Sequence, residues 1–242
     1  MALAGDHVQV LVGGYELTGD HNRITVNDKR DMHDVTAFGD AVHTFVPGKR
    51  NIALEHAGYM NADTARSHPV LSGVGIEGVV SLLVGQNSDP AVGDPVFSLD
   101  VLQGKYSNLP EIGKYVPFGA AFATIGNLGG WGVALAVPVT FTETTNGSGV
   151  DNSAASSNGG AAYLHILQAA ASDTYTIVVE GSATGSFSGE ESTLATFTLD
   201  ASVIGSERQA ISGTIPRYVR WKATRSGSAG DTVKIAVSLV RF

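Results

Sequence analysis

The sequence has no cysteine and few aromatic residues, which make up 7% of its 242 residues, and only 16% are charged. The absence of cysteine excludes disulfide bonds and every metal site built on thiolates. Basic residues are also scarce, with 15 Lys and Arg against 23 Asp and Glu, which gives a net charge of −8. Because such a chain gains little from releasing the counterions of a phosphate backbone, the composition disfavours a protein that grips nucleic acid.

Signals for targeting or membrane insertion are missing as well. Residues 1–7 contain neither a basic region nor an apolar run, so no secretory signal is predicted. The uncharged stretch 115–142 is long enough to span a bilayer, but Pro117, Pro138 and five glycines interrupt it. We interpret it as two apolar strands and expect a soluble protein without membrane contact.

The sequence is rich in glycine, with 30 residues, and 43% of its residues are hydrophobic. Together with many Val, Thr and Ser, this predicts an all-β fold with a substantial core and many turns. One short helix is expected within 62–70, with Asn61 as its cap and Pro69 at its end. The apolar patterns predict strands over 8–17, 24–26, 35–38, 51–59, 78–85, 95–102, 115–125 and 131–141, then over 162–168, 175–181, 193–199, 209–214, 217–225 and 232–242.

A stretch of small polar residues divides the chain. Fourteen of the 20 residues in 142–161 are Gly, Ser, Thr or Asn, which predicts a flexible linker or a long exposed loop. The division leaves two β-sandwich domains, 1–141 and 162–242. Up to Thr145 there are 15 acidic and 8 basic residues, and after it 8 and 7, so the first part carries nearly all of the negative charge.

The second domain has features of a copy of the first. Four pairs of segments match in the same order, which indicates an internal duplication. The alternative is that strands of any all-β protein resemble each other. The pairs are Val80–Gly85 with Thr176–Gly181, Phe97–Asp100 with Phe197–Asp200, Lys114–Val116 with Arg217–Val219, and Val133–Val137 with Val233–Val237.

No motif for catalysis or for cofactor binding is present. The histidines fall mostly within the first 68 residues, but none form a pair at i, i+2 or i, i+4, so no metal site and no cofactor are predicted. The four aspartates Asp28, Asp31, Asp34 and Asp40 are interspersed with Lys29 and Arg30, as in an exposed loop. We therefore expect that the protein is not an enzyme.

The strand 217–225 has two different faces. Alternation places Val219, Trp221 and Ala223 in the core and Tyr218, Arg220 and Lys222 outside. The outer face could contact an acidic neighbour, such as another subunit, or could simply be solvated.

The most informative stretch is 24–59. It contains Asp34–Asp40 (DVTAFGD), then Phe45–Arg50 (FVPGKR), then a strand that ends in His56–Met60 (HAGYM). With Gly13–Leu17 (GGYEL), these features make residues 8–62 similar to the tail tube, or major tail, proteins of long-tailed (siphovirus-type) bacteriophages. Residues 162–242 resemble the C-terminal domain of related phage structural proteins through AYLHI and SGTIPRYVRW.

This resemblance implies a structural virion protein. Tube subunits are β-sandwiches that form stacked rings, and their inner strands close into one oligomeric β-barrel around a channel. DNA would pass through this channel without specific binding, and the acidic composition would give it an acidic wall. The expected location is the phage tail, after synthesis in the host cytoplasm, and the expected partners are further copies of the chain, the tape measure protein and the terminator protein.

The resemblance also points to a contact region and to a ring size. Residues 39–50 are expected to form a loop or hairpin that contacts a neighbouring subunit through Phe38, Gly39, Phe45, Val46, Pro47 and Gly48. If the duplication holds, three chains would form a pseudo-hexameric ring, which we favour; if the second domain is a decoration, six chains would. The alternatives are a capsid decoration or tail terminator protein and, from another class, a carbohydrate-binding β-sandwich module.

Overall fold

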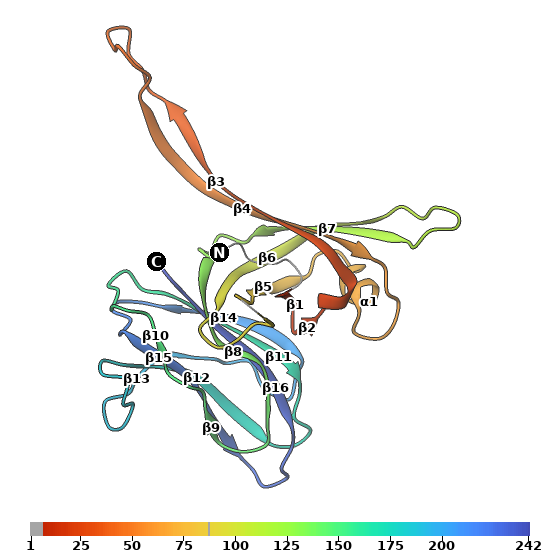
Figure 1. Cartoon of the computed structure of the whole chain (residues 1–242), viewed down its shortest axis with the longest axis vertical. Helices are drawn as coiled ribbons and strands as arrows, with labels where there is room; N and C mark the ends of the chain where they lie inside the picture. The colour runs from red at the N-terminus through yellow and green to blue at the C-terminus, as the bar shows by residue number, and fades with distance from the viewer. Residues whose placement is uncertain (1–6, 87) are drawn as a thin grey trace.

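The computed structural model describes residues 7–86 and 88–242. The chain is almost entirely β, as predicted, and forms two sheets (Figure 1). The first half contains β1 (Val8–Val12), β2 (Tyr15–Glu16), the 3-10 turn η2 (Thr18–Asp20), β3 (His21–Asp34), β4 (Phe45–Tyr59), α1 (Ser67–Leu71), β5 (Glu77–Val84), β6 (Pro95–Asn108), β7 (Pro117–Thr124) and β8 (Gly130–Phe141). The second half contains β9 (Thr145–Asn146), β10 (Val150–Asp151), β11 (Gly160–Gln168), β12 (Thr174–Ser182), β13 (Ser192–Thr196), β14 (Gly205–Ile211), β15 (Tyr218–Ser226) and β16 (Val233–Arg241).

The larger sheet belongs to both halves. Its main path runs β14-β11-β16-β8-β6-β5-β1-β2, and a branch from β6 continues through β7 and β4 to β3. The two halves meet where β16 pairs with β8, for example at Val237 and Ala136. The smaller sheet, β10-β15-β12-β13 with β9 beside β15, belongs to the second half.

Three apolar layers hold these sheets together. In the first half, Phe97, Phe118 and Phe122 are buried with Ile52 and Leu54 between the β3-β4-β7 branch and the β1-β5-β6 part of the sheet. In the second half, a core that includes Trp221 lies between the two sheets. The third layer lies between the halves and is built on Leu11, Leu83, Val96, Ala134 and Ala236, with Val79, Ala161, Tyr163 and Val240 beside them.

The layer between the halves also contains a buried polar row. The imidazole Nε2 of His165 lies 2.9 Å from Ser81 Oγ. Ser81 Oγ lies 2.8 Å from Ser98 Oγ, which lies 2.7 Å from Ser238 Oγ. The row crosses four strands from both halves, so it fixes how the halves pack.

The backbones of the two halves approach closely beside this row. Gly14 has a φ of +91°, and a Cβ on it would lie 2.5 Å from the backbone nitrogen of Gly205. Ser206 Oγ accepts a 2.8 Å hydrogen bond from the Val79 amide. Only glycine fits at position 14, both for its backbone angle and for the space available.

The segment 142–161 lies along the smaller sheet. Its strands β9 and β10 both pair with β15, and Val150 is buried in the second core. The division of the chain into two domains joined by a flexible linker stays a prediction.

Two expectations about local structure are wrong. The segment Val35–Phe38 is not a strand but forms the tip of the β3–β4 hairpin, whose first strand extends over His21–Asp34. The helix begins at Ser67 and includes Pro69, and Arg66 rather than Asn61 is at its cap position. Proline is tolerated there because the amides of a first helical turn have no intrahelical partner.

The matched segments of the expected duplication do not occupy equivalent places. Phe97–Asp100 lies within β6, whereas Phe197–Asp200 follows the end of β13, and Tyr115 precedes β7, whereas Tyr218 begins β15. These two pairs of segments therefore differ in secondary structure, and the internal duplication stays a prediction. Val133–Val137 and Val233–Val237 are both strands, but they belong to β8 and β16, which pair with each other.

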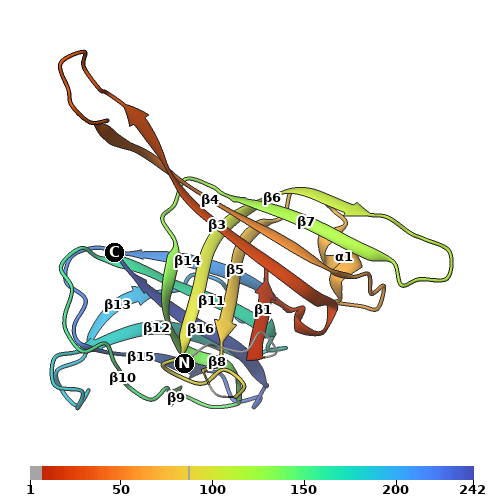
Figure 2. The ribbon, with the colours of Figure 1, turned by 45° about the horizontal axis from the view of Figure 1, so that its top comes forward.

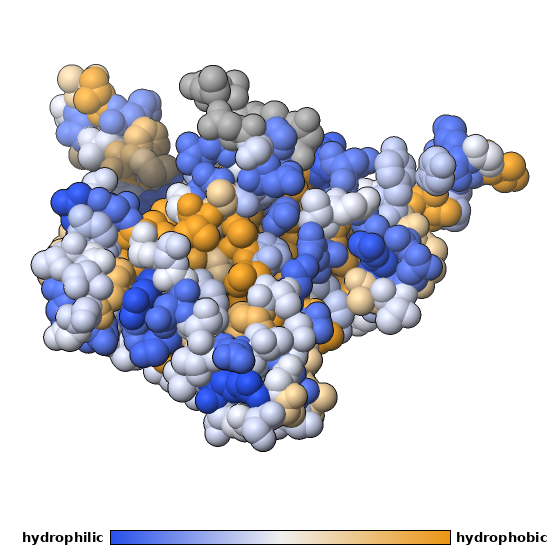
Figure 3. All heavy atoms as spheres, turned by 60° about the horizontal axis from the view of Figure 1, so that its bottom comes forward, coloured by the Kyte–Doolittle hydropathy of each residue, from blue (hydrophilic) through white to orange (hydrophobic). Residues whose placement is uncertain are grey.

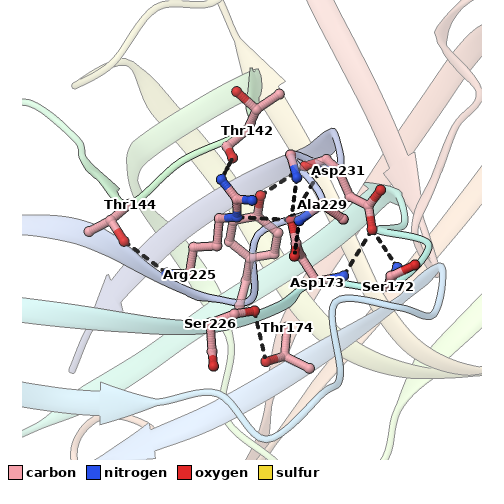
Figure 4. Close-up of polar contacts among 11 residues, drawn as sticks. Thr142, Thr144, Ser172, Asp173, Thr174, Arg225, Ser226, Ala229 and Asp231 are labelled. Carbon is pink, nitrogen blue, oxygen red and sulfur yellow. Dashed lines mark hydrogen bonds and ion pairs between the residues drawn. The ribbon is translucent and has the colours of Figure 1, made fainter.

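The buried carboxylate of Asp173 is the centre of a cluster of polar contacts at one end of the second half (Figure 4). Asp173 accepts hydrogen bonds from the amides of Ala229, Gly230 and Asp231 at 2.8–3.1 Å, and its carboxylate lies 2.8 Å from Arg225 Nε. These amides and the Arg225 guanidinium hold the pKa of Asp173 below its usual value against the opposing effect of desolvation. The guanidinium also donates to the Thr142 carbonyl, so this cluster joins three segments of the chain.

We expect Asp173→Asn to lower the thermal midpoint of unfolding, because it removes the charge that pairs with Arg225 and turns an NH2 group toward backbone amides that donate to the carboxylate. The measurement is calorimetry at pH 7. Asp200→Asn is the control, because Asp200 caps an exposed turn through the Ser202 amide and makes no ion pair within the described residues. Equal midpoints for the two variants would show that the pair with Arg225 contributes nothing.

Candidate assembly surface

The β3–β4 hairpin extends far beyond the core as an arm, defined here as residues 27–51 (Figures 1 and 2). Its strands pair from the His21–Gly58 end to Asp34–Phe45. Beyond Val26 and Ile52 both faces of the ribbon lose contact with the core, and most side chains are exposed. The hairpin expected around residues 39–50 is thus part of a much longer element.

An ion pair stiffens the root of the arm. Arg50 Nε donates a 2.8 Å hydrogen bond to Asp28 Oδ1, and Arg50 Nη1 donates to the Gly129 carbonyl at 3.2 Å. The hydrogen bond from Arg50 lowers the pKa of Asp28, and Asp28 raises the pKa of Arg50 in turn. The contact with Gly129 anchors the arm to the loop between β7 and β8.

The tip of the arm, residues 34–44, is an ordered turn with apolar side chains on its surface. Asp34 accepts hydrogen bonds from the amide and hydroxyl of Thr36, which lower its pKa, and Asp40 accepts one from the Ala37 amide. Phe38 is fully exposed. With it, the large apolar side chains exposed on the outer arm and its tip are Met32, Val35, Val42, Phe45 and Val46.

A second exposed apolar group lies at the opposite end of the same strands. It consists of Tyr59, at the end of β4, and of Leu109, Ile112 and Tyr115 in the loop between β6 and β7, and we call it the base. The rings of Tyr59 and Tyr115 are 5.8 Å apart between centroids. They border a hollow of about 440 Å³ with Glu111 and Pro117. Apolar side chains show at the ends of both projections, the arm and the β6–β7 loop (Figure 3).

Between tip and base, the β3-β4-β7-β6 sheet has one open face. Its other face covers the core of the first half, with Leu54, His56 and Phe122 buried. Alternation along each strand places these residues on the open face: Arg23, Thr25, Asn27 and Lys29 of β3, Lys49, Asn51, Ala53, Glu55 and Ala57 of β4, Gly119, Ala121 and Ala123 of β7, and Lys105 and Ser107 of β6.

The open face does not match the acidic wall expected from the sequence. It carries four cations, Arg23, Lys29, Lys49 and Lys105, and one acid, Glu55. The expectation came from the net charge of the first part. The acids that produce this charge lie elsewhere, such as Asp20 beneath Ser67 and Asp28 beside Arg50.

The predicted contact residues fall into two separate groups. Phe38, Gly39, Phe45, Val46 and Pro47 lie exposed on the arm or its tip, while Gly48 packs so closely on His33 that a Cβ would lie 2.7 Å from its Nε2. Their contact with another subunit stays a prediction. The base was not predicted, although apolar residues among the turn formers Pro110 and Gly113 are a signal that could have identified it.

The second group, Tyr218, Arg220 and Lys222, lies in the second half, and its side chains contact other residues of the same chain. Arg220 and Lys222 both pair with Glu180 of β12, at 2.9 and 3.3 Å, and Arg220 also stacks on Phe187 at 4.4 Å. Tyr218 carries the Arg217 guanidinium over its ring. Glu180 thus supplies an acidic partner for this face within the chain, and contact of the face with another subunit stays a prediction. Val219, Trp221 and Ala223 are buried as predicted.

The histidines of the first half gather at one point only. His21 Nε2 lies 3.0 Å from His56 Nδ1, near the end of the β3–β4 pair that is opposite the arm. Burial lowers the pKa of both, that of His56 to about 3. Among residues 7–86 and 88–242, no group of three or more His, Asp or Glu could hold a metal ion. No helix in this part of the chain is long and apolar enough to cross a membrane.

No protein-family model and no curated protein matches the sequence. Among solved structures, a chain from the virion of a native gene transfer agent particle is 13% identical, with a TM-score of 0.42 over 53% of this chain and 98% of that one. A chain from the tail of the empty gene transfer agent particle, with C6 symmetry, is also 13% identical, with a TM-score of 0.38 over 52% and 96%. The Dit protein of phage SPP1, a hub of the adsorption apparatus of phages that infect Gram-positive bacteria, is 11% identical, with a TM-score of 0.37 over 97% and 99%.

Proposed function

We propose that the protein is a structural subunit of a phage tail tube, in which copies form rings and the rings stack head to tail. One observation carries this proposal: the two exposed apolar groups, tip and base, lie at opposite ends of one sheet. Large apolar side chains that are exposed together mark contact sites. A tip that docks on the base of the next copy makes a heterologous contact, which repeats without end along the sheet.

The dimensions of the arm set the expected repeat. The 15 residues of β4 run from the tip to the base, which is about 46 Å at a rise of 3.3 Å per residue. A strand tilt of roughly 35–45° in a closed barrel shortens its projection on the axis to about 35 Å. Stacked rings should therefore repeat roughly every 33–38 Å.

The edge of the sheet supports the ring. β3 pairs only with β4 among the described strands, so one edge of a 14-residue strand is free to pair with another copy. Closing the sheet into a barrel removes such edges. The open face would then line the channel, with the second half outside. Because each chain offers one such sheet, six chains per ring fit this arrangement better than the three favoured by a duplication.

Introducing a negative charge at the tip tests whether the tip makes the stacking contact. We expect Phe38→Asp and Phe45→Asp to abolish stacking, because each puts a carboxylate into an apolar contact while leaving a monomer that has no core residue changed. The measurement is negative-stain electron microscopy of the purified protein, in which the wild type should give rings and filaments. Val203→Asp is the control, since Val203 is 54% exposed but lies in the second half. Normal filaments from both tip variants would contradict the proposal.

The Tyr59–Tyr115 pair favours one candidate of another class. Two exposed aromatic rings beside Glu111 resemble the platform on which a sugar stacks. A carbohydrate-binding module would retain binding on a glycan array in the monomeric Phe38→Asp variant and lose it in Tyr115→Ala. A capsid decoration or tail terminator protein would give single rings or spots without a repeat.

A further inference from the structure

The open face is cationic in a chain that is acidic overall. Four of the 15 Lys and Arg lie on it with a single acid, which gives the face a charge of +3 in a chain of net charge −8. None of these five charged side chains makes an ion pair with another residue that the structure describes. Elsewhere Arg50, Lys114, Arg217, Arg220, Lys222, Arg225 and Lys234 are paired. The cations of the open face thus have no counterion among the residues that the structure describes.

Apart from Leu102, which lies opposite Ala123, the remaining side chains in the middle of the face are mostly small. Ala53, Ala57, Gly119, Ala121 and Ala123 occupy its middle strands, and a hollow of about 300 Å³ lies among Arg23, Glu55 and Lys105. Between tip and base no aromatic side chain lies on this face. A partner can therefore approach the sheet closely. A single-stranded nucleic acid is disfavoured, because its bases would have no aromatic side chain on which to stack.

We propose that the open face binds the phosphate backbone of duplex DNA, without reading its sequence. This deepens the proposed function, in which the same face lines the channel. Duplex DNA carries about one charge per 1.7 Å of its axis and releases counterions where a cation replaces them. Arg23 and Lys29 are six residues apart on β3, about 20 Å at 3.3 Å per residue. Both can therefore reach one duplex segment, and the contact is weak because Glu55 and the net charge oppose it.

Salt provides the first test. With four phosphate contacts, the affinity for a 30-base-pair duplex is expected to fall about 100-fold between 50 and 200 mM NaCl. Fluorescence anisotropy of the full chain at 50 mM NaCl measures this, both on the assembled wild type and on Phe38→Asp. The two readouts separate the proposals: assembly of the wild type without DNA binding overturns this inference alone, and DNA binding by a wild type that forms no rings or filaments overturns the tube alone.

Substitutions provide the second test. The quadruple variant Arg23→Gln, Lys29→Gln, Lys49→Gln and Lys105→Gln should lose at least tenfold in affinity, and Glu55→Gln should gain. The matched control, Arg66→Gln, Lys114→Gln, Arg217→Gln and Lys234→Gln, changes the net charge equally, leaves the buried Glu180 cluster intact and should bind like the wild type. An equal loss in both quadruple variants would assign binding to overall charge and overturn the inference. So would competition by polyglutamate at equal charge, which would identify the partner as an acidic protein chain.

Discussion

Lowering the pH from 7.5 to 4.5 should reduce the free energy of unfolding by about 5 kcal/mol, most of it through two buried histidines. Burial lowers the pKa of His165 to about 3, and burial together with the neighbouring His21 lowers that of His56 to about 3. Between pH 6.5 and 3 the unfolded chain therefore binds protons that the folded chain does not, and stability falls as the pH falls. Each histidine contributes about 1.4 kcal/mol per pH unit in this window, and nothing above it.

The measurement is urea unfolding at pH 7.5, 6.0, 5.0 and 4.5. His165→Asn should flatten the dependence by about 1.4 kcal/mol per pH unit below pH 6, because the amide retains a hydrogen bond to Ser81 without titrating. His33→Asn, at an exposed position of the arm, should leave the slope unchanged. A wild-type stability that is constant from pH 7.5 to 4.5 would show that both imidazoles gain protons freely in the folded chain.

The second large effect is expected at Glu180. Its side chain is buried, and Arg220 and Lys222 are its two partners. Removing one partner of a buried ion pair leaves an uncompensated charge, so Glu180→Ala should cost about 3–5 kcal/mol at pH 7. Replacing the whole cluster by apolar residues is far less costly, because no charge is then left unpaired. The triple variant Glu180→Met, Arg220→Met and Lys222→Met should therefore recover most of the loss.

The free energies of unfolding of the wild type, Glu180→Ala and the triple variant, measured with denaturant, test this expectation by comparison with one another. Glu111→Ala serves as control, since its pair with Lys114 is mostly exposed and should contribute less than 1 kcal/mol. If the triple variant is no more stable than Glu180→Ala, the cluster stabilises through packing, such as that of Arg220 on Phe187, and not through its charges.

Sequence patterns predicted the strands that bury one face in a core. They missed the strand segments that are exposed to solvent on both faces. Val219, Trp221 and Ala223 alternate because one face of β15 packs on a core, and this pattern is visible in the sequence. Beyond Val26, β3 is solvated on both faces, so nothing in its polar run distinguishes a strand from a loop. Its length is set by cross-strand pairing with β4, which depends on residues 11 to 37 positions away.

The candidate surface was predicted in part for the same reason. The arm was visible because Phe38, Phe45 and Val46 interrupt a polar stretch. The base could not be assembled from sequence, because Tyr59 and Tyr115 meet only through the pairing of β4 with β7. The positive charge of the open face could not be inferred from the net charge of the first half. Strand alternation places Asp28 and Lys29 on opposite faces, and a net charge does not record on which face each residue lies.

The position of β16 in the shared sheet has a consequence for synthesis. β16 lies between β8 and β11, yet it leaves the ribosome about 100 residues after β8. At 5–20 residues per second, β8 waits roughly 5–20 s with an open edge before its neighbour exists. During this interval the nascent chain presents an apolar strand that pairs readily with other strands. The larger sheet is therefore complete only when β16, the last described strand, has been inserted between β8 and β11.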